Sequence, residues 1–399
     1  MDFQSYWLLA LPIFFGLGWL AARVDIRHLL TESRALPASY FKGLNFLLNE
    51  QPDKAIEAFI EVARAEQQTI ELHFALGSLF RRRGEVDRAT RMHQNLVERA
   101  DLGSDQRMAA LHELAQDYLK AGLLDRAEAL FKDLRSSGFS ESALRHLLDI
   151  YVTEKDWQKA IETAEALEKA TGDSYRSEIA NFHCELAAIE YGHSRLEEAQ
   201  AQIAAALEAH RKCVRANVML GTWAQREGRH EDALAIWKRI EGQAPEYLFL
   251  IAAPLIDSMR TLGQVQEALT LLRGWLQRYP ALDLLGVVFQ ATQEEEGAES
   301  ALQLVREELH RSPSLGALDK FLEAQLATVA PEQRADLQLM RDLVHAHSSR
   351  FTLFQCNRCG FKARSFHWHC PACGQWDSYP PQRNAEGDSG QVAGQRGGM

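Results

Sequence analysis

Residues 76–89 read Leu-Gly-Ser-Leu-Phe-Arg-Arg-Arg-Gly-Glu-Val-Asp-Arg-Ala, and this stretch predicts the fold of most of the chain. Gly77 and Ala89 are small enough to let two helices approach closely, and Gly84 permits a tight turn between those helices. Such a hairpin leaves one apolar face that only a neighbouring hairpin can cover. The stretch therefore predicts a helical repeat.

The same pattern recurs along the chain with a fixed period. Equivalent alanines follow one another at intervals of 34, 38, 33, 39, 34, 35 and 33 residues, which is the tetratricopeptide period. Pro245, Pro280 and Pro313 fall near repeat ends, where proline stops one helix and lets the next begin. We therefore expect an all-α fold, a tetratricopeptide-repeat superhelix over residues 36–345 with about eight repeats and a capping helical pair. The equivalent positions are Ala55, Ala89, Ala127, Ala160, Ala199, Ala233, Ala268 and Ala301.

A repeat array of this kind presents a long groove that binds an extended or helical segment of another protein. Two charge clusters, Arg81 to Arg83 and Glu294 to Glu296, are expected to be solvated turns, because exposed charge is the default. For the arginine cluster, contact with anionic lipid or an acidic partner is the alternative.

Four cysteines near the C-terminus form two Cys-x-x-Cys-Gly turns separated by ten residues. Each turn points two thiolates at one metal ion, and two turns complete a tetrahedral site, for which zinc is favoured over iron. A closed four-thiolate site has no position for water or substrate, so its expected role is structural. The predicted ligands are Cys356, Cys359, Cys370 and Cys373. His367 and His369 are the alternative ligands beside the second turn.

Aromatic side chains crowd the predicted metal-binding module, residues 346–381. They are more numerous than a core of that size can hide, so we expect most of them to pack on the preceding repeats. The alternative is a surface for a partner. These residues are Phe351, Phe354, Phe361, Phe366, Trp368, Trp376 and Tyr379.

The N-terminus carries the membrane signal. Tyr6 to Ala22 is a run of seventeen residues without a charge, close to the lower limit of about 17 residues for a membrane-spanning helix. The following arginines and lysines predict that everything after residue 22 is cytoplasmic. We expect a transmembrane anchor over residues 1–22, a juxtamembrane linker over 23–35, and a disordered Gly-rich tail over 382–399.

Composition and motifs exclude several functions. A net charge of −11 argues against broad phosphate-backbone binding, although Arg350, Arg358, Lys362 and Arg364 give the metal module some local positive charge. The sequence has no phosphate-binding Gly-Lys loop and no nucleophile elbow, so we expect no enzyme activity. Cys184 and Cys213 lie in repeat helices and are expected to be small buried hydrophobic residues.

The order of these parts resembles the lipopolysaccharide assembly protein B family of Gram-negative bacteria. The resemblance rests on the anchor and on residues 45–48 and 79–89 of the repeats. Above all, it rests on the two Cys-x-x-Cys-Gly turns, called knuckles below, together with Trp368. It implies a single-pass inner-membrane protein with its bulk on the cytoplasmic side and a rubredoxin-like module packed against the repeats. The four cysteines named above are the implied metal ligands.

The resemblance also implies partners. Members of the family promote degradation, by the membrane-bound AAA+ protease FtsH, of the UDP-acyl-GlcNAc deacetylase that commits precursor to lipid A. An inner-membrane regulator antagonises them. The expected function is therefore a membrane-anchored adaptor that regulates lipopolysaccharide synthesis, without nucleic-acid binding. An iron-binding electron-transfer protein and a nucleic-acid-binding zinc ribbon remain the alternatives, and the sequence leaves open whether the chain forms a homodimer.

Overall fold

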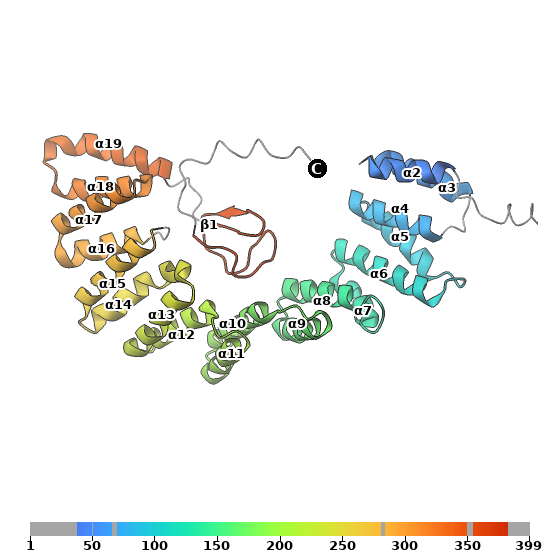
Figure 1. Ribbon diagram of the computed structural model, residues 1–399, viewed down its shortest axis with the longest axis horizontal. Coiled ribbons are helices and arrows are strands. Elements are labelled where there is room, and N and C mark those ends of the chain that lie inside the picture. Colours follow the sequence, from blue (N-terminus) through green and yellow to red (C-terminus); the bar gives the residue numbers. More distant parts are fainter. Residues whose placement is uncertain (1–37, 50, 66–69, 281–283, 349–353, 382–399) are drawn as a thin grey trace, which may run out of the picture. The chain divides into compact units, whose positions relative to one another are not determined.

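The computed structural model describes residues 38–49, 51–65, 70–280, 284–348 and 354–381. Helices make up nearly all of this part of the chain, and they follow one another as antiparallel pairs (Figure 1). The chain divides into two compact units, and the boundary in the sequence falls within α8, between Leu147 and Leu148. The first unit contains α2 (Ala38–Leu48), α3 (Pro52–Ala65), α4 (Ile70–Arg83), α5 (Val86–Val97), α6 (Ser104–Lys120), α7 (Leu124–Leu134) and the start of α8 (Ser140–Glu154).

The second unit contains the remaining helical hairpins and the metal-binding module. A short 3-10 helix, η1 (Pro245–Leu250), interrupts the succession of hairpins between α13 and α14. The helices are α9 (Trp157–Thr171), α10 (Arg176–Gly192), α11 (Leu196–Ala209), α12 (Val214–Arg226), α13 (His230–Gln243), α14 (Ala252–Thr261), α15 (Val265–Arg278), α16 (Leu285–Glu296), α17 (Ala298–Arg311), α18 (Leu315–Thr328) and α19 (Pro331–Ser348).

The repeat alanines lie where the predicted pattern requires them. All eight are buried, with at most 1% of their surface exposed, inside the helix pairs. Glycines on the first helix of a hairpin face large side chains on the second: a Cβ on Gly77 would lie 2.3 Å from His93, and one on Gly221 would lie 2.2 Å from Trp237. The turn residue Gly84 has φ +85°, a conformation that favours glycine. The tetratricopeptide-type fold of the repeats is thereby confirmed.

The close approach at Gly221 gives a stability prediction. Alanine at this position is expected to destabilise the protein by about 1–3 kcal/mol, because the added methyl must displace the fully buried Trp237 ring. Gly274→Ala is the matched control, since this glycine is also inside a helix but a Cβ there meets only the end of Arg278, at 3.7 Å. Urea unfolding followed by circular dichroism measures the free energy of unfolding of both variants. A Gly221→Ala protein as stable as Gly274→Ala would contradict the packing argument.

The prediction that the two charge clusters are solvated turns was wrong in part. Arg81 forms ion pairs with Glu113 at 2.5 Å and with Asp117 at 2.7 Å, both on the first helix of the next hairpin. Arg82 is exposed, and Arg83 pairs with Asp53 at 2.6 Å. The first of these arginines therefore joins two repeats.

The acidic cluster, Glu294 to Glu296, also joins neighbouring helices of the repeats through ion pairs. Arg260 on α14 pairs with Glu294 at 2.7 Å and with Glu295 at 2.9 Å on α16, while Arg273 on α15 pairs with Glu296 at 2.7 Å. The physical reason is the stacking itself, because successive hairpins bring residues about one repeat apart into contact.

The module is small and irregular. Two short strands, β1 (Phe354–Gln355) and β2 (Lys362–Ala363), pair antiparallel with Phe354 opposite Ala363. Among the described residues no helix is both long and apolar enough to cross a membrane. The expected anchor, linker and tail, and Phe351, lie outside the described residues.

Candidate metal centre

Two matching backbone turns carry the four cysteines. In the first, the Cys356 amide donates to the Phe361 carbonyl and the Gly360 amide donates to the Cys356 carbonyl, each at 2.9 Å. In the second, Cys370 makes the same pair of bonds with Gln375 and Gly374, again at 2.9 Å. Gly360 and Gly374 have φ +75° and +69°, so the glycine that ends each motif is required by the turn.

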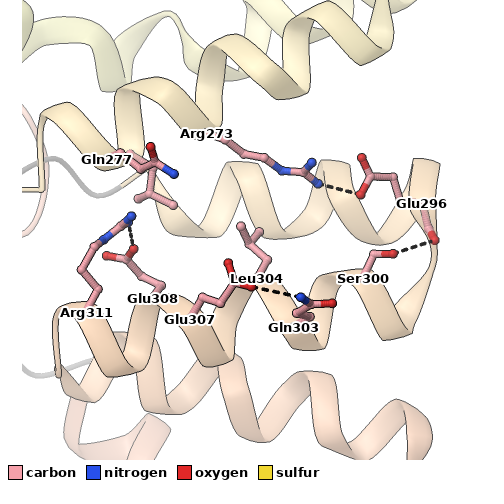
Figure 2. A pocket seen from close by; sticks show the side chains of 10 residues that line it. Arg273, Gln277, Glu296, Ser300, Gln303, Leu304, Glu307, Glu308 and Arg311 are labelled. Atoms are coloured by element: carbon pink, nitrogen blue, oxygen red, sulfur yellow. Dashed lines mark hydrogen bonds and ion pairs between the residues drawn. The ribbon is translucent and has the colours of Figure 1, made fainter.

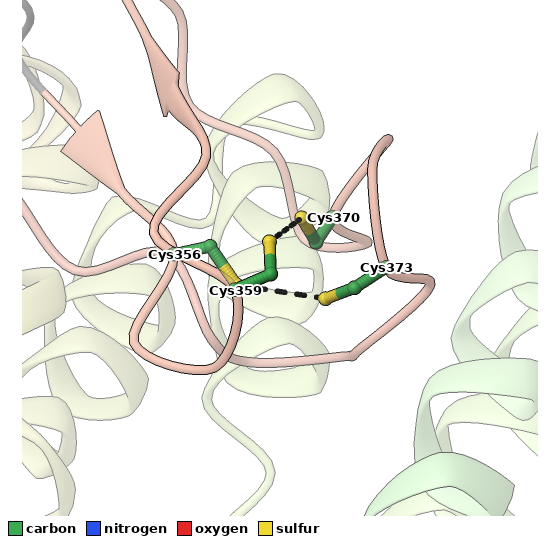
Figure 3. Close-up of side chains that lie close together, drawn as sticks. All are labelled: Cys356, Cys359, Cys370 and Cys373. Atoms are coloured by element: carbon green, nitrogen blue, oxygen red, sulfur yellow. Dashed lines mark hydrogen bonds between the residues drawn. The ribbon is translucent and has the colours of Figure 1, made fainter. Parts of the chain in front are cut away.

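The turns bring the four sulfur atoms together (Figure 3). All four lie within 4.8 Å of one another, with Sγ to Sγ distances of 3.7 Å for Cys356 and Cys373 and 3.8 Å for Cys359 and Cys370. Bonds of about 2.3 Å in a tetrahedron give edges of about 3.8 Å, so one zinc ion fits between these sulfurs. The four predicted ligands therefore form a possible metal site.

Electrostatics at the site also favour a cation. Burial raises the pKa of Cys356, but its hydrogen bonds with the Ser378 hydroxyl and with two backbone amides outweigh burial and lower the pKa to about 6. At Cys373 a backbone amide acts to lower the pKa, whereas burial and the neighbouring thiols raise it to about 12. Four thiols at these distances cannot all ionise without a cation, because the thiolates repel one another. A bound cation offsets this repulsion.

Neither histidine beside the second knuckle joins the sulfurs. Nε2 of His367 lies 3.1 Å from the Ser365 hydroxyl. The His369 ring packs on Trp376 at 4.6 Å between centroids, and burial lowers its pKa. Within the described part of the chain, the cluster of candidate ligand atoms consists of the four cysteines.

Most aromatic residues of the module pack on the repeats, as expected. Trp376 meets Trp157 of α9 and Phe182 of α10 edge-to-face, with centroid distances of 6.2 and 5.8 Å. Trp368 stacks on Tyr247 of η1 at 5.4 Å. Two of the described aromatic residues do not pack on the repeats: Tyr379 is fully buried inside the module itself, and Phe361 is 41% exposed.

A polar contact that the sequence did not predict also joins the module to the repeats. The carboxylate of Asp377 accepts hydrogen bonds from the Ser177 hydroxyl at 2.9 Å and from the Asn181 amide at 2.8 Å. The Tyr247 hydroxyl donates to the Asp377 carbonyl at 3.2 Å. Burial raises the pKa of this carboxylate despite the two donors. No sequence periodicity could reveal it, because the partners are about 200 residues apart.

Neither the two cysteines of the repeats nor the polar pocket described next forms a comparable metal site. Cys184 and Cys213 are buried with their sulfurs 3.9 Å apart, in agreement with their prediction as buried hydrophobic residues, but Cys213 lies just before α12 instead of inside a repeat helix. Figure 2 shows a pocket between α15, α16 and α17 whose charged and polar side chains pair with one another. Its pairs are Arg273 with Glu296, Gln303 with Glu307 and Arg311 with Glu308.

The repeats and the four-cysteine module together define a tetratricopeptide-repeat protein with a rubredoxin-type metal-binding domain. Residues 354–380 match the family described as rubredoxin metal binding domain, and residues 112–175 and 184–247 match the tetratricopeptide repeat. The chain is 34% identical to lipopolysaccharide assembly protein B of Escherichia coli K12, over 95% of this chain and 98% of that protein. The chain therefore belongs to the lipopolysaccharide assembly protein B family.

A second relative has the same name. The Haemophilus influenzae protein is 30% identical over 95% of this chain and 98% of its own length. Among solved structures, the crystal structure of MamA is similar to 43% of this chain, with 18% identity and a TM-score of 0.32.

Proposed function

We propose that this protein is a non-enzymatic adaptor in lipopolysaccharide assembly, anchored in the inner membrane by residues 6–22 and working on its cytoplasmic side. The observation that carries the proposal is its similarity, along nearly the whole chain, to relatives named for lipopolysaccharide assembly. The adaptor presents the UDP-acyl-GlcNAc deacetylase of lipid A synthesis to the protease FtsH and is restrained by an inner-membrane antagonist. A shared membrane raises the effective concentration of adaptor and protease without any new contact.

The arrangement of the metal site supports a structural role for the ion. Four sulfurs that complete a tetrahedron leave no open position for substrate, and the knuckles stand directly beside the docking residues Trp368 and Trp376. When bound, one zinc ion would fold a segment too small to form its own core. The four cysteines would hold it, and the aromatic residues would attach the folded module to the repeats.

Removal of the anchor tests the adaptor. A chain without residues 1–22 is expected to stay folded, because the described helices begin only at Ala38, yet to lose the ability to lower deacetylase abundance in cells. Immunoblotting of the deacetylase after inhibition of protein synthesis measures its half-life. A half-life as short as that with the complete chain would count against a membrane adaptor, provided both chains accumulate equally.

A second candidate function is electron transfer through iron. The match to the rubredoxin metal binding domain favours it, as does the exposure of Cys359 at the outer edge of the site. Purified protein with iron would be coloured and would bleach reversibly on reduction, whereas a colourless protein with one zinc ion per chain excludes this function.

A further inference from the structure

The face of the repeats beneath the metal module resembles a receptor for a short segment. Trp376 and Asp377, adjacent in sequence, project from the module onto α9, α10 and α12. The indole meets Trp157 and Phe182, and the guanidinium of Arg215 lies over the same indole at 5.5 Å. A cation over the face of an indole is attracted by the negative charge of the ring face.

The acidic residue of the pair is held by donors that the repeats supply. Ser177 and Asn181 stand one helical turn apart on α10, and both donate to one oxygen of the Asp377 carboxylate. The guanidinium of Arg215, at the start of α12, lies near enough to favour the ionised Asp377 carboxylate, but its own ion pair is with Glu185, at 2.8 Å through Nη2. The repeats thus offer an aromatic floor beside a group of donors for an anion.

This receptor still has unused hydrogen-bonding capacity. Asn181 is fully buried and Arg215 is 9% exposed, yet Oδ1 of Asn181 and Nη1 of Arg215 have no partner among the described residues. A buried polar atom without a hydrogen-bond partner destabilises the docked arrangement. Trp376 and Asp377 therefore leave one acceptor on Asn181 and one donor on Arg215 that another segment can engage.

We propose that this face, formed by α9, α10 and α12, binds a partner-protein segment in which an aromatic residue is followed directly by an acidic one. Trp376 and Asp377 occupy the same place within the chain when the module is docked. The partner segment exchanges with them and also engages the free atoms of Asn181 and Arg215. The identity of the partner depends on the adaptor role proposed above, but the binding itself does not.

The test uses the full-length, metal-loaded chain and a labelled peptide. The probe is a fluorescein-labelled heptapeptide with the sequence of residues 374–380, Gly-Gln-Trp-Asp-Ser-Tyr-Pro. The receptor is vacated with the double substitution Trp376→Ala and Asp377→Ala, and metal content is measured to show that the knuckles remain loaded. If the substitutions release the ion, wild-type chain treated with a chelator is used instead, because removing the ion unfolds the module that covers α9, α10 and α12.

Fluorescence anisotropy is expected to show at least tenfold tighter binding to the vacated chain than to wild type. Adding Asn181→Ala to the vacated chain is expected to weaken binding at least tenfold, which corresponds to about 1.4 kcal/mol. Ser300→Ala, a substitution on α17 far along the chain from α10, is the matched control and should leave binding unchanged. A probe with Asn in place of Asp should bind at least tenfold more weakly.

Several results would overturn the proposal. These are equal binding to wild-type and vacated chains, no binding to either, insensitivity to Asn181→Ala, or equal binding of the Asp and Asn probes. Failure of the deacetylase experiment together with successful peptide binding would reject the adaptor function and leave this receptor in place.

Discussion

A chain carrying Cys356→Ser and Cys359→Ser is expected to contain no bound metal and to lose the fold of residues 354–381. Two of four thiolates are gone, and the ion that replaces a core in a module of this size contributes about 10 kcal/mol or more in comparable small domains. Metal analysis gives the ion content. Hydrogen exchange is expected to show loss of protection in the module and on η1, where Trp368 stacks on Tyr247.

The chain offers a matched control for this experiment. Cys184→Ala with Cys213→Ala also removes two cysteines, but from a buried pair whose sulfurs are 3.9 Å apart in the repeats. This control is expected to retain its metal and a protected module. Protection of residues 354–381 in the Cys356→Ser, Cys359→Ser chain equal to that in the control would show that the module folds without the ion.

Arg81→Ala is expected to destabilise the protein by about 3 kcal/mol, the lower end of the cost of breaking a buried ion pair. The Asp117 side chain is fully buried and would keep only His93, whose Nδ1 lies 2.5 Å from the carboxylate. Urea unfolding followed by circular dichroism gives the change in the free energy of unfolding. Arg82→Ala, the exposed neighbour, should change it by less than about 0.5 kcal/mol.

A second substitution separates charge from packing at this place. Adding Asp117→Asn to Arg81→Ala should restore part of the lost stability, because the buried carboxylate that lost its partner is then neutral. Equal losses for Arg81→Ala and Arg82→Ala would show that the ion pair between repeats contributes nothing.

The repeats and the knuckles could be predicted because their signals are local. Small residues at fixed spacing describe a hairpin, and two Cys-x-x-Cys-Gly turns describe a metal site within a few residues of chain. Predicting the ion pairs between repeats was within reach as well. Arg81 pairs 32 and 36 residues ahead, and Arg260 pairs 34 and 35 residues ahead. Opposite charges about one repeat apart are the sequence signal for these ion pairs.

Other features had no comparable signal. Pro245 was expected only to separate two repeats, but it begins η1, which presents Tyr247 and Phe249 to the module. Asp377 meets Asn181 across 196 residues, and neither position follows from the period of the repeats. Such contacts depend on how the folded module docks on the folded repeats. The residue pattern within one repeat carries no information about that docking.

The hydrogen bonds from α10 to Asp377 close a ring of chain that contains α11 to α19. A pulling force applied between Pro381 and the first unit would therefore pass from the module directly into α10. The hairpins inside the ring would carry no tension until that junction ruptured. The short polar and aromatic contact, rather than the many hairpins beyond it, would set the mechanical strength of this end of the molecule.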